Sequence, residues 1–237
     1  GLNNVDLVEI AGGRVLVAAS DRSDLTQVQL FLALLDTATG QLAPAGKIVV
    51  GPGEGYGICI VKPPGAEGIV AFSAPKQGTI YRTVITQTAG GAFIGTTTTL
   101  AQIATQVEGC IADPRTATLY IGEEDAGIWA IDMTTGAKRM VAPIDNRMLV
   151  ADVEGLAIAP EGADGGYLVA SSQGDNAFAV YRLPDVTPLG RFRIAAGAFG
   201  SVEETDGIEL DNRDFGPDFP GGIFVAQDGI NAPKAQN

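Results

Sequence analysis

Short apolar runs bounded by turn-forming residues make up most of the chain. Residues 119–121 and 167–170 are continuously apolar, and residues 177–181 mix aromatic with small and β-branched side chains. Gly, Pro and Asp stand between such runs, as in Asp113-Pro114-Arg115. Runs of this length with this punctuation are typical of β-strands. No stretch combines a 3.6-residue apolar period with helix caps, so the pattern predicts an all-β protein.

A short motif recurs along the chain at regular intervals. It consists of an acidic residue, a glycine and an apolar strand, and its fullest copies begin at Glu108, Glu154 and Asp206. Looser copies are centred on Asp6 and Tyr56, so successive copies are 46 to 52 residues apart. Each motif is followed by a turn, then by an apolar strand with a polar end. A third strand follows, with an aromatic residue near its centre, as around Tyr81, Trp129 and Phe178.

A repeat of about 50 residues with three or four strands is typical of a β-propeller blade. The alternative is a large β-sandwich or barrel in which the similarity between units is accidental. Strand order, turns and polar strand ends all recur together, which favours the propeller. Five motifs predict about five blades, each a four-stranded antiparallel sheet, within a single domain over residues 1–237. Either the ring has five blades, or a longer ring lacks its ends in this chain.

Composition restricts the chemistry that the protein can perform. The chain contains no histidine, and 28 acidic against 15 basic side chains give a formal net charge of −13. The missing imidazole excludes a Ser-His-Asp triad, a Cys-His dyad, a His-ligated zinc site and a histidine acid phosphatase. The acid excess argues against a nucleic-acid partner. No apolar run approaches the ~20 residues of a membrane span, so we expect no membrane partner.

The two cysteines, Cys59 and Cys110, do not indicate a disulfide framework. We expect buried free thiols, with a bridge between the two as the alternative. The sequence begins at Gly1 without an initiator methionine or a signal peptide, which is expected of a processed protein or of a fragment.

The repeated acids are the candidate functional residues. The first strand of each propeller blade lines the central channel, so we expect Glu108, Asp152, Glu154 and Asp206 to converge at one mouth of it. Glu124 ends a second strand and approaches from outside, and Gln173 does the same in the next unit. Carboxylates at such density raise one another's pKa, and a calcium ion with its oxygen ligands relieves the conflict.

These residues resemble the β-propeller phytases, the calcium-dependent 3-phytase family that hydrolyses inositol hexakisphosphate. The segments that carry the resemblance span nearly the whole chain: Leu2–Asp6, Ala18–Ser23, Val107–Gly109, Leu119–Asp125 with Ile128–Trp129, Asp152–Leu156, Ala170–Gly174, Thr205–Ile208 and Phe224–Gly229. The resemblance implies a six-bladed β-propeller, of which this chain covers about five blades and is truncated at both ends.

The resemblance also implies a role for each candidate residue. The residues that match ligands of the catalytic calcium cluster are Glu108, Glu124, Asp152, Glu154, Gln173 and Asp206. Tyr56 matches a tyrosine that helps to hold a metal-bound phosphate or water, which makes Tyr56, Glu108, Asp152, Glu154 and Gln173 the candidate catalytic set. Arg22 and Lys76 match basic residues that bind substrate phosphates. Gly200-Ser201 stands where family members often have Asp-Gly, which predicts that a structural calcium site is lost or altered.

The implied reaction is phosphomonoester hydrolysis by attack of a calcium-bound water, with several Ca²⁺ ions and no phospho-enzyme. The implied substrate is calcium phytate, and the expected protein is a secreted monomer, extracellular or periplasmic. Two other functions stay open. One is a calcium-dependent lactonase-like propeller, and the other is a non-catalytic calcium-binding propeller.

Overall fold

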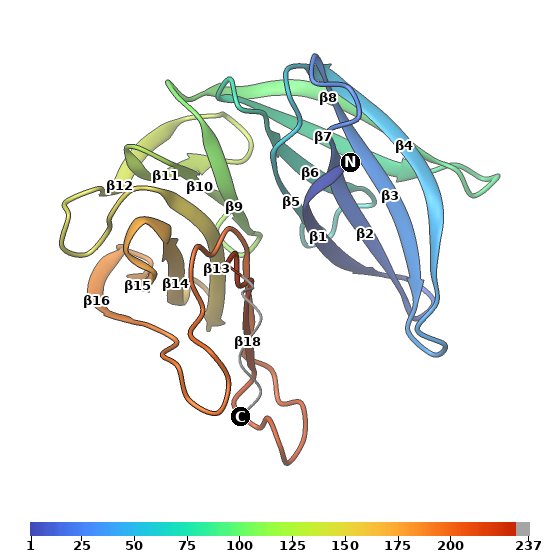
Figure 1. Ribbon diagram of the computed structural model, residues 1–237. Helices are drawn as coiled ribbons and strands as arrows, with labels where there is room; N and C mark the ends of the chain where they lie inside the picture. Colours follow the sequence, from blue (N-terminus) through green and yellow to red (C-terminus); the bar gives the residue numbers. More distant parts are fainter. Residues whose placement is uncertain (231–237) are drawn as a thin grey trace.

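The computed structural model describes residues 1–230 as strands joined by short turns, with one short 3₁₀ helix, η1 (Gln173–Asp175). Four sheets have four antiparallel strands each, and in every one of them consecutive strands are neighbours. Figure 1 shows these sheets one after another along the chain, followed by a small hairpin. Within the described residues, no helix has the length and apolar character that crossing a membrane requires.

Each four-stranded sheet is one blade, and the blades follow the sequence in order. Blade 1 contains β1 (Leu2–Ile10), β2 (Arg14–Asp21), β3 (Gln27–Asp36) and β4 (Leu42–Pro52). Blade 2 contains β5 (Gly57–Val61), β6 (Ile69–Ala74), β7 (Thr79–Gln87) and β8 (Phe93–Gln102). Blade 3 contains β9 (Val107–Asp113), β10 (Thr118–Glu123), β11 (Gly127–Asp132) and β12 (Lys138–Pro143). Blade 4 contains β13 (Val153–Glu161), β14 (Gly165–Ser172), β15 (Ala177–Leu183) and β16 (Thr187–Phe192).

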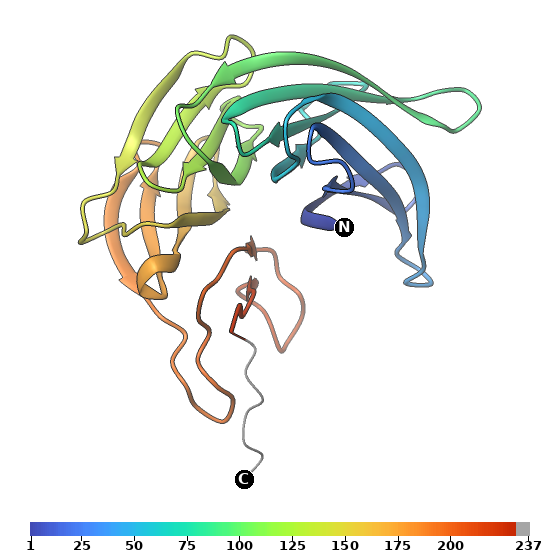
Figure 2. The ribbon, with the colours of Figure 1, turned by 45° about the horizontal axis from the view of Figure 1, so that its top comes forward.

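The first strands of the blades lie next to one another around a common centre. β1 contacts β5, β5 contacts β9, β9 contacts β13, and β13 contacts β17 (Ile208–Asp211). Figure 2 shows the sheets arranged as an arc around that centre. This is the radial arrangement of a β-propeller, and it confirms the all-β class, the four-stranded antiparallel blades and the inner position of the repeated motif.

The predicted number of blades is wrong. The described residues form four four-stranded blades, not five or six, and a separate two-stranded sheet of β17 and β18 (Ile223–Ala226). The fifth motif does start an inner strand, but a long segment rich in Asp, Gly and Pro separates β17 from β18. Only Gln227–Ile230 of the described chain follow β18, which is too short for two further strands.

The apolar core lies between successive blades. One buried cluster joins blades 1 and 2 through side chains such as Leu30 and Ile58, and a second joins blades 2 and 3 through Phe72 and Leu119. A third, which includes Leu168, joins blades 3 and 4. Because these clusters pack each blade against the next one along the chain, the inner strands are held at fixed separations, and so are the residues at their ends.

The glycine of the repeated motif lets neighbouring inner strands approach closely. A Cβ at Gly57 would lie 2.2 Å from the carbonyl oxygen of Glu108, and one at Gly109 would lie 2.0 Å from that of Glu154. At Gly155 it would lie 2.8 Å from the carbonyl oxygen of Asp206. Each of these three glycines therefore packs against the backbone of the motif acid in the next unit, and no other residue has room there.

The expectation of free thiols is also wrong, because Cys59 and Cys110 form a disulfide. Cys59 lies on β5 and Cys110 on β9, the adjacent inner strands of blades 2 and 3. Their Cα atoms are 5.5 Å apart, within the range that a disulfide spans. The close packing of the two strands against Gly57 brings the thiols together, and that packing between blades cannot be read from cysteine spacing.

Candidate functional site

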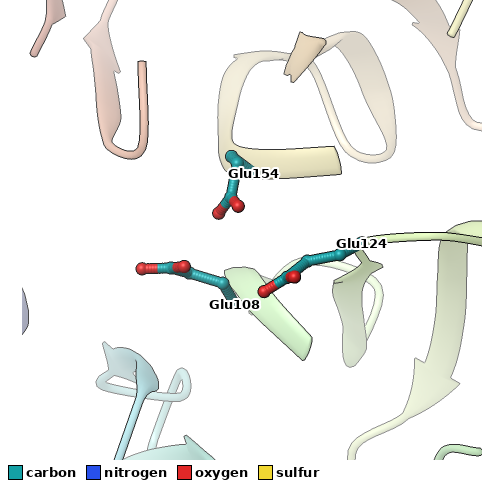
Figure 3. Close-up of side chains that lie close together, drawn as sticks. All are labelled: Glu108, Glu124 and Glu154. Atoms are coloured by element: carbon teal, nitrogen blue, oxygen red, sulfur yellow. The ribbon is translucent and has the colours of Figure 1, made fainter. Parts of the chain in front are cut away.

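Three glutamates from blades 3 and 4 meet at one end of the inner strands. Glu108 is the second residue of β9, Glu154 is the second residue of β13, and Glu124 directly follows β10. One carboxylate oxygen from each lies within 4.8 Å of those of the other two. In Figure 3 the side chain of Glu154 faces those of Glu108 and Glu124. We call these three residues the acidic cluster.

The backbone fixes the position of Glu124 between two neighbouring segments. Its N–H donates to the carbonyl of Gln106 at 3.1 Å, and its carbonyl accepts from the N–H of Val153 at 3.0 Å. The second bond joins the end of β10 to the start of β13, one residue before Glu154. The cluster geometry is therefore set by main-chain contacts and not only by side-chain rotamers.

Burial and mutual repulsion make the ionised cluster unfavourable. Burial raises the pKa of the Glu154 carboxyl well above its usual range, and the nearby carboxylates of Glu108 and Glu124 raise it further. Burial also raises the pKa of Glu124, with Glu108 and Asp152 adding to the effect. The pKa of Asp206 is raised by burial and by Glu108. Without a cation these groups retain protons at pH values where free carboxyls have lost them.

Neutral amides partly satisfy the carboxylates. The Asn4 side chain donates to Glu108 at 2.8 Å, that of Gln106 donates to Glu124 at 2.5 Å, and that of Gln173 donates to Asp206 at 2.7 Å. Glu154 Oε2 is buried and has no hydrogen-bond partner within residues 1–230. An acceptor oxygen buried without a partner is costly, so its presence indicates a place for a positively charged ligand.

The donor set fits a hard divalent cation. All of the cluster's potential ligand atoms are carboxylate oxygens, and the side-chain amides of Asn4 and Gln106 lie beside them. Oxygen-only surroundings of this kind suit Ca²⁺, which takes 6–8 oxygen ligands, and do not suit metals that prefer nitrogen or sulfur. The acidic cluster could hold a cation, and two of its three members, Glu108 and Glu154, are repeated acids.

Three further predicted ligands lie around the cluster. Asp152 precedes β13, its carbonyl accepts from the Gln173 N–H at 2.9 Å, and its carboxylate raises the pKa of Glu124. Asp206 precedes β17, and its charge acts on Glu154. Asp152 and Asp206 are thus near the acidic cluster but outside the group whose oxygens lie within 4.8 Å. Gln173 links the two, through its N–H to Asp152 and its side-chain amide to Asp206.

The predicted phosphate-binding residues, Arg22 after β2 of blade 1 and Lys76 after β6 of blade 2, gather around Tyr56. Arg22 Cζ lies 5.5 Å and Lys76 Nζ lies 4.5 Å from the centre of the Tyr56 ring. Burial raises the pKa of Tyr56, and so does its hydrogen bond with Glu108. Tyr56 therefore contacts the two cations through its ring and the acidic cluster through its hydroxyl.

Sequence reasoning missed Glu54, which pairs with both predicted phosphate-binding residues. Glu54 Oε1 contacts Arg22 Nη2 and lies 3.8 Å from Lys76 Nζ. Glu54 stands two positions before Tyr56, outside the repeated motif, so the repeat gave no signal for it. Asn4 was missed as a partner of Glu108 for a related reason, since the first copy of the motif was centred on Asp6.

Asp6 does not occupy the position that the repeat assigned to it. It lies within β1, and its carboxylate accepts from the Ile60 N–H at 2.7 Å, while Asn4 reaches Glu108 at the mouth. Burial raises the pKa of Asp6 to about 7. The first unit therefore places an amide at the mouth and its acid farther along the inner strand.

The fold and the site together define the class of this protein. It is a β-propeller whose inner strands place a carboxylate cluster, suited to a divalent cation, beside a tyrosine and two basic side chains. Residues 1–237 match the family model Phytase over their whole length, and the chain belongs to that family.

One relative and one solved structure indicate how far the likeness extends. The chain is 32% identical over 249 aligned residues to a 3-phytase of Bacillus subtilis (strain 168). That alignment covers 99% of this chain and 65% of the relative, so the chain spans about two thirds of the relative's length. A solved structure of a humanized mutant of Chaetomium thermophilum Polycomb Repressive Complex 2, bound to the inhibitor GSK126, is similar with a TM-score of 0.57. The two sequences are 12% identical, and the aligned region covers 95% of this chain and 47% of the solved chain. This likeness supports the fold alone.

Proposed function

We propose that the chain acts as a calcium-dependent phosphatase that removes phosphate groups from phytate. The observation that carries the proposal is the acidic cluster beside Arg22, Lys76 and Tyr56, in a chain that belongs to the Phytase family. A cluster of acids repels an anionic substrate, so this pairing of acids with phosphate-binding cations makes sense only when a cation is bound between them.

The residues divide into two groups by their proposed roles. Glu108, Glu124 and Glu154 form the centre of the calcium site, and Asp152, Gln173 and Asp206 complete it. Tyr56 helps to orient a phosphate or water beside Glu108, and Arg22 and Lys76 bind phosphate oxygens. When bound, calcium supplies charge neutralisation for the phosphate and acidification of a bound water. The chain's own residues hold the cation and align the phosphate with it.

The disulfide supports a secreted location. Bridges such as Cys59–Cys110 persist in oxidising compartments and are rare in the cytosol. We propose an extracellular or periplasmic monomer that acts on calcium phytate, with no nucleic-acid or membrane partner. The formal charge of −13 is consistent with the absence of a nucleic-acid partner.

The test is release of inorganic phosphate from phytate by the purified chain, with saturating Ca²⁺ and with excess EDTA. We expect release only with Ca²⁺. Glu108→Gln and Glu154→Gln should each lower the rate more than about tenfold, because each removes a charged ligand from the cation site. Glu161→Gln is the matched control, since Glu161 is an acid paired with Arg182 on blade 4 and away from the cluster.

Each other outcome points to a different function. Equal phosphate release in EDTA contradicts calcium dependence. Hydrolysis of a lactone without phosphate release favours the lactonase-like alternative. Stabilisation by Ca²⁺ with neither reaction favours the non-catalytic calcium-binding propeller.

A further inference from the structure

Glu54 occupies the position between the two cations that the proposed function assigns to substrate phosphate. A single oxygen, Glu54 Oε1, contacts Arg22 Nη2 and lies 3.8 Å from Lys76 Nζ. The side chains of Glu54, Arg22 and Lys76 are 17%, 31% and 30% exposed, so all three are largely shielded from water. Shielding strengthens the attraction between them relative to a fully solvated ion pair.

The three residues are part of the phosphate-binding side of the site and not a distant surface pair. Both cations lie over the ring of Tyr56, whose hydroxyl bonds with Glu108 of the acidic cluster. A phosphate bound by Arg22 and Lys76 must therefore compete with the Glu54 carboxylate for the same space beside Tyr56. An anion on the same donors competes with phosphate directly.

The main chain around Glu54 is held independently of its carboxylate. Its N–H donates to Gln77 Oε1 at 3.0 Å, and its carbonyl accepts from the Lys76 N–H at 3.3 Å. Arg22 is likewise anchored by its own N–H, which donates to the Gly1 carbonyl at 2.8 Å. The carboxylate can move away from the cations while the backbone of both partners stays in place.

Glu54 does not use all of the donors of Arg22. Its Nη1 donates to Asn3 Oδ1 at 3.4 Å and its Nη2 to Glu54, but Nε is buried and has no partner in the described part of the chain. One carboxylate oxygen uses only part of the donor capacity of Arg22 and Lys76, whereas a phosphate offers three oxygens to them.

We infer that Glu54 is a placeholder anion, which occupies the subsite of Arg22 and Lys76 when it is empty and is displaced by a substrate phosphate. This inference rests on the proposed phosphatase function and adds a residue to its binding site. The placeholder prevents the two cations from pairing with the nearby acidic cluster. It also weakens retention of the released phosphate, because Glu54 recaptures the same donors.

The test is direct binding of inorganic phosphate to the Ca²⁺-loaded chain, measured by isothermal titration calorimetry. Glu54→Gln keeps the size of the side chain and one acceptor oxygen but removes the competing charge. We expect it to tighten phosphate binding by about tenfold, which corresponds to about 1.4 kcal/mol. Glu161→Gln makes the same change in net charge away from the site and should leave the affinity unchanged.

A double variant separates displacement from a general electrostatic effect. In the Arg22→Gln background, Glu54→Gln should tighten phosphate binding much less than in the wild type, because the contested donors are gone. Glu54→Asp keeps the charge on a shorter side chain, and we expect its affinity to lie near that of the wild type.

The outcomes distinguish this inference from the function on which it rests. If the wild type binds phosphate and releases it from phytate, but Glu54→Gln binds phosphate equally or more weakly, the placeholder role is wrong and the phosphatase function stands. If the wild type neither binds phosphate nor releases it from phytate, both are wrong.

Discussion

At the mouth of the propeller, each residue of the repeated motif acts through both its backbone and its side chain. The carbonyl of Glu154 packs against Gly109 of the preceding blade, while its carboxylate joins Glu108 and Glu124. The motif, in which the sequence indicated metal ligands followed by a glycine, therefore also forms a close backbone contact between blades. We call this contact the joint between blades. The two roles predict different consequences for substitutions at adjacent positions.

Replacement of the motif glycine should weaken the joint between blades. In Gly109→Ala the added Cβ would lie 2.0 Å from the Glu154 carbonyl oxygen, so β9 and β13 would have to separate. Overpacking of this kind costs about 1–3 kcal/mol, which we expect as a lower urea midpoint. Gly190→Ala is the control, because a Cβ there meets nothing within 4 Å. Equal midpoints for the two variants would contradict the joint.

Neutralising one acid of the cluster should stabilise the cation-free protein and weaken the effect of calcium. Glu154→Gln removes a buried carboxyl that must either retain a proton above its ordinary pKa or, when ionised, repel Glu108 and Glu124. We therefore expect a higher Tm in EDTA than for the wild type, but a smaller rise in Tm on adding Ca²⁺. Differential scanning calorimetry measures both. A lower Tm in EDTA together with an undiminished calcium effect would show that Glu154 does not belong to the cation site.

At the scale of elements, the sequence predicted strands well and contacts between blades poorly. The third-strand positions around Tyr81, Trp129 and Phe178 were predicted from local pattern, and β7, β11 and β15 confirm them. Local pattern is enough here because each strand carries its own period and its own turns. The number of complete blades was overestimated because one motif identifies only the first strand of a blade.

The disulfide is the clearest case of a contact that local pattern cannot predict. Cys59 and Cys110 are 51 residues apart, about one repeat, so they occupy similar positions on neighbouring inner strands. The repeat spacing already implied this equivalence, since Cys59 closely follows the motif position Tyr56 and Cys110 closely follows Glu108. The sequence did not show that β5 and β9 lie close enough for a bridge, because that distance depends on Gly57 and on packing between blades.

Loss of the disulfide should destabilise the protein without a change in its chemistry. It closes a loop of about 51 residues, for which removal typically costs about 2–4 kcal/mol. We expect Cys59→Ala/Cys110→Ala to lower the urea midpoint, and a thiol reductant to do the same to the wild type. The double variant itself is the control, because the reductant should leave it unchanged. A reductant effect on the variant would point to a cause other than the bridge.

At the scale of the molecule, the convergence of separate units on one site could be predicted, and the pairing of individual charges could not. Glu108 and Glu154 meet because a ring brings equivalent positions together, which follows from the repeat alone. Glu54 lies on a loop outside the repeat, and its pairing with Arg22 and Lys76 depends on how that loop folds over Tyr56. Side chains outside the repeat, such as Glu54, have no regular spacing in the sequence from which their partners could be predicted.

The acidic cluster also predicts how the stability of the whole molecule depends on pH. The folded-state pKa values of Glu124, Glu154 and Asp206 are raised above their ordinary values. The cation-free folded state thus binds more protons than the unfolded state above the ordinary carboxyl pKa, and stability is lost as pH rises through the raised values. In EDTA we expect a lower free energy of unfolding at pH 8 than at pH 5.

Other acids with shifted pKa values either do not contribute to this change or can be separated from it. The hydrogen bond from Lys47 lowers the pKa of Asp21 to about 2, so its stabilising contribution is present above its unfolded pKa and is lost only as pH falls through about 2. Asp6, with a pKa of about 7, and Glu209, whose pKa is raised by burial, add to the loss of stability as pH rises, but they lie within β1 and β17. Their contributions to the loss of stability should persist in Glu154→Gln, whereas the contribution of the cluster should shrink.

Calcium should reverse the contribution of the acidic cluster to the pH dependence of stability. As the carboxyls lose protons they become better ligands, so Ca²⁺ binds the folded state more tightly at pH 8 than at pH 5 and stabilises it more. Urea unfolding at both pH values, in EDTA and in saturating Ca²⁺, gives the free energy of unfolding under the four conditions that the comparison needs. We expect the increment from Ca²⁺ to be larger at pH 8, and smaller at both pH values in Glu154→Gln. An increment that is the same at both pH values would mean that calcium and protons do not compete for these carboxylates, and the acidic cluster would then not be the site at which calcium stabilises the fold.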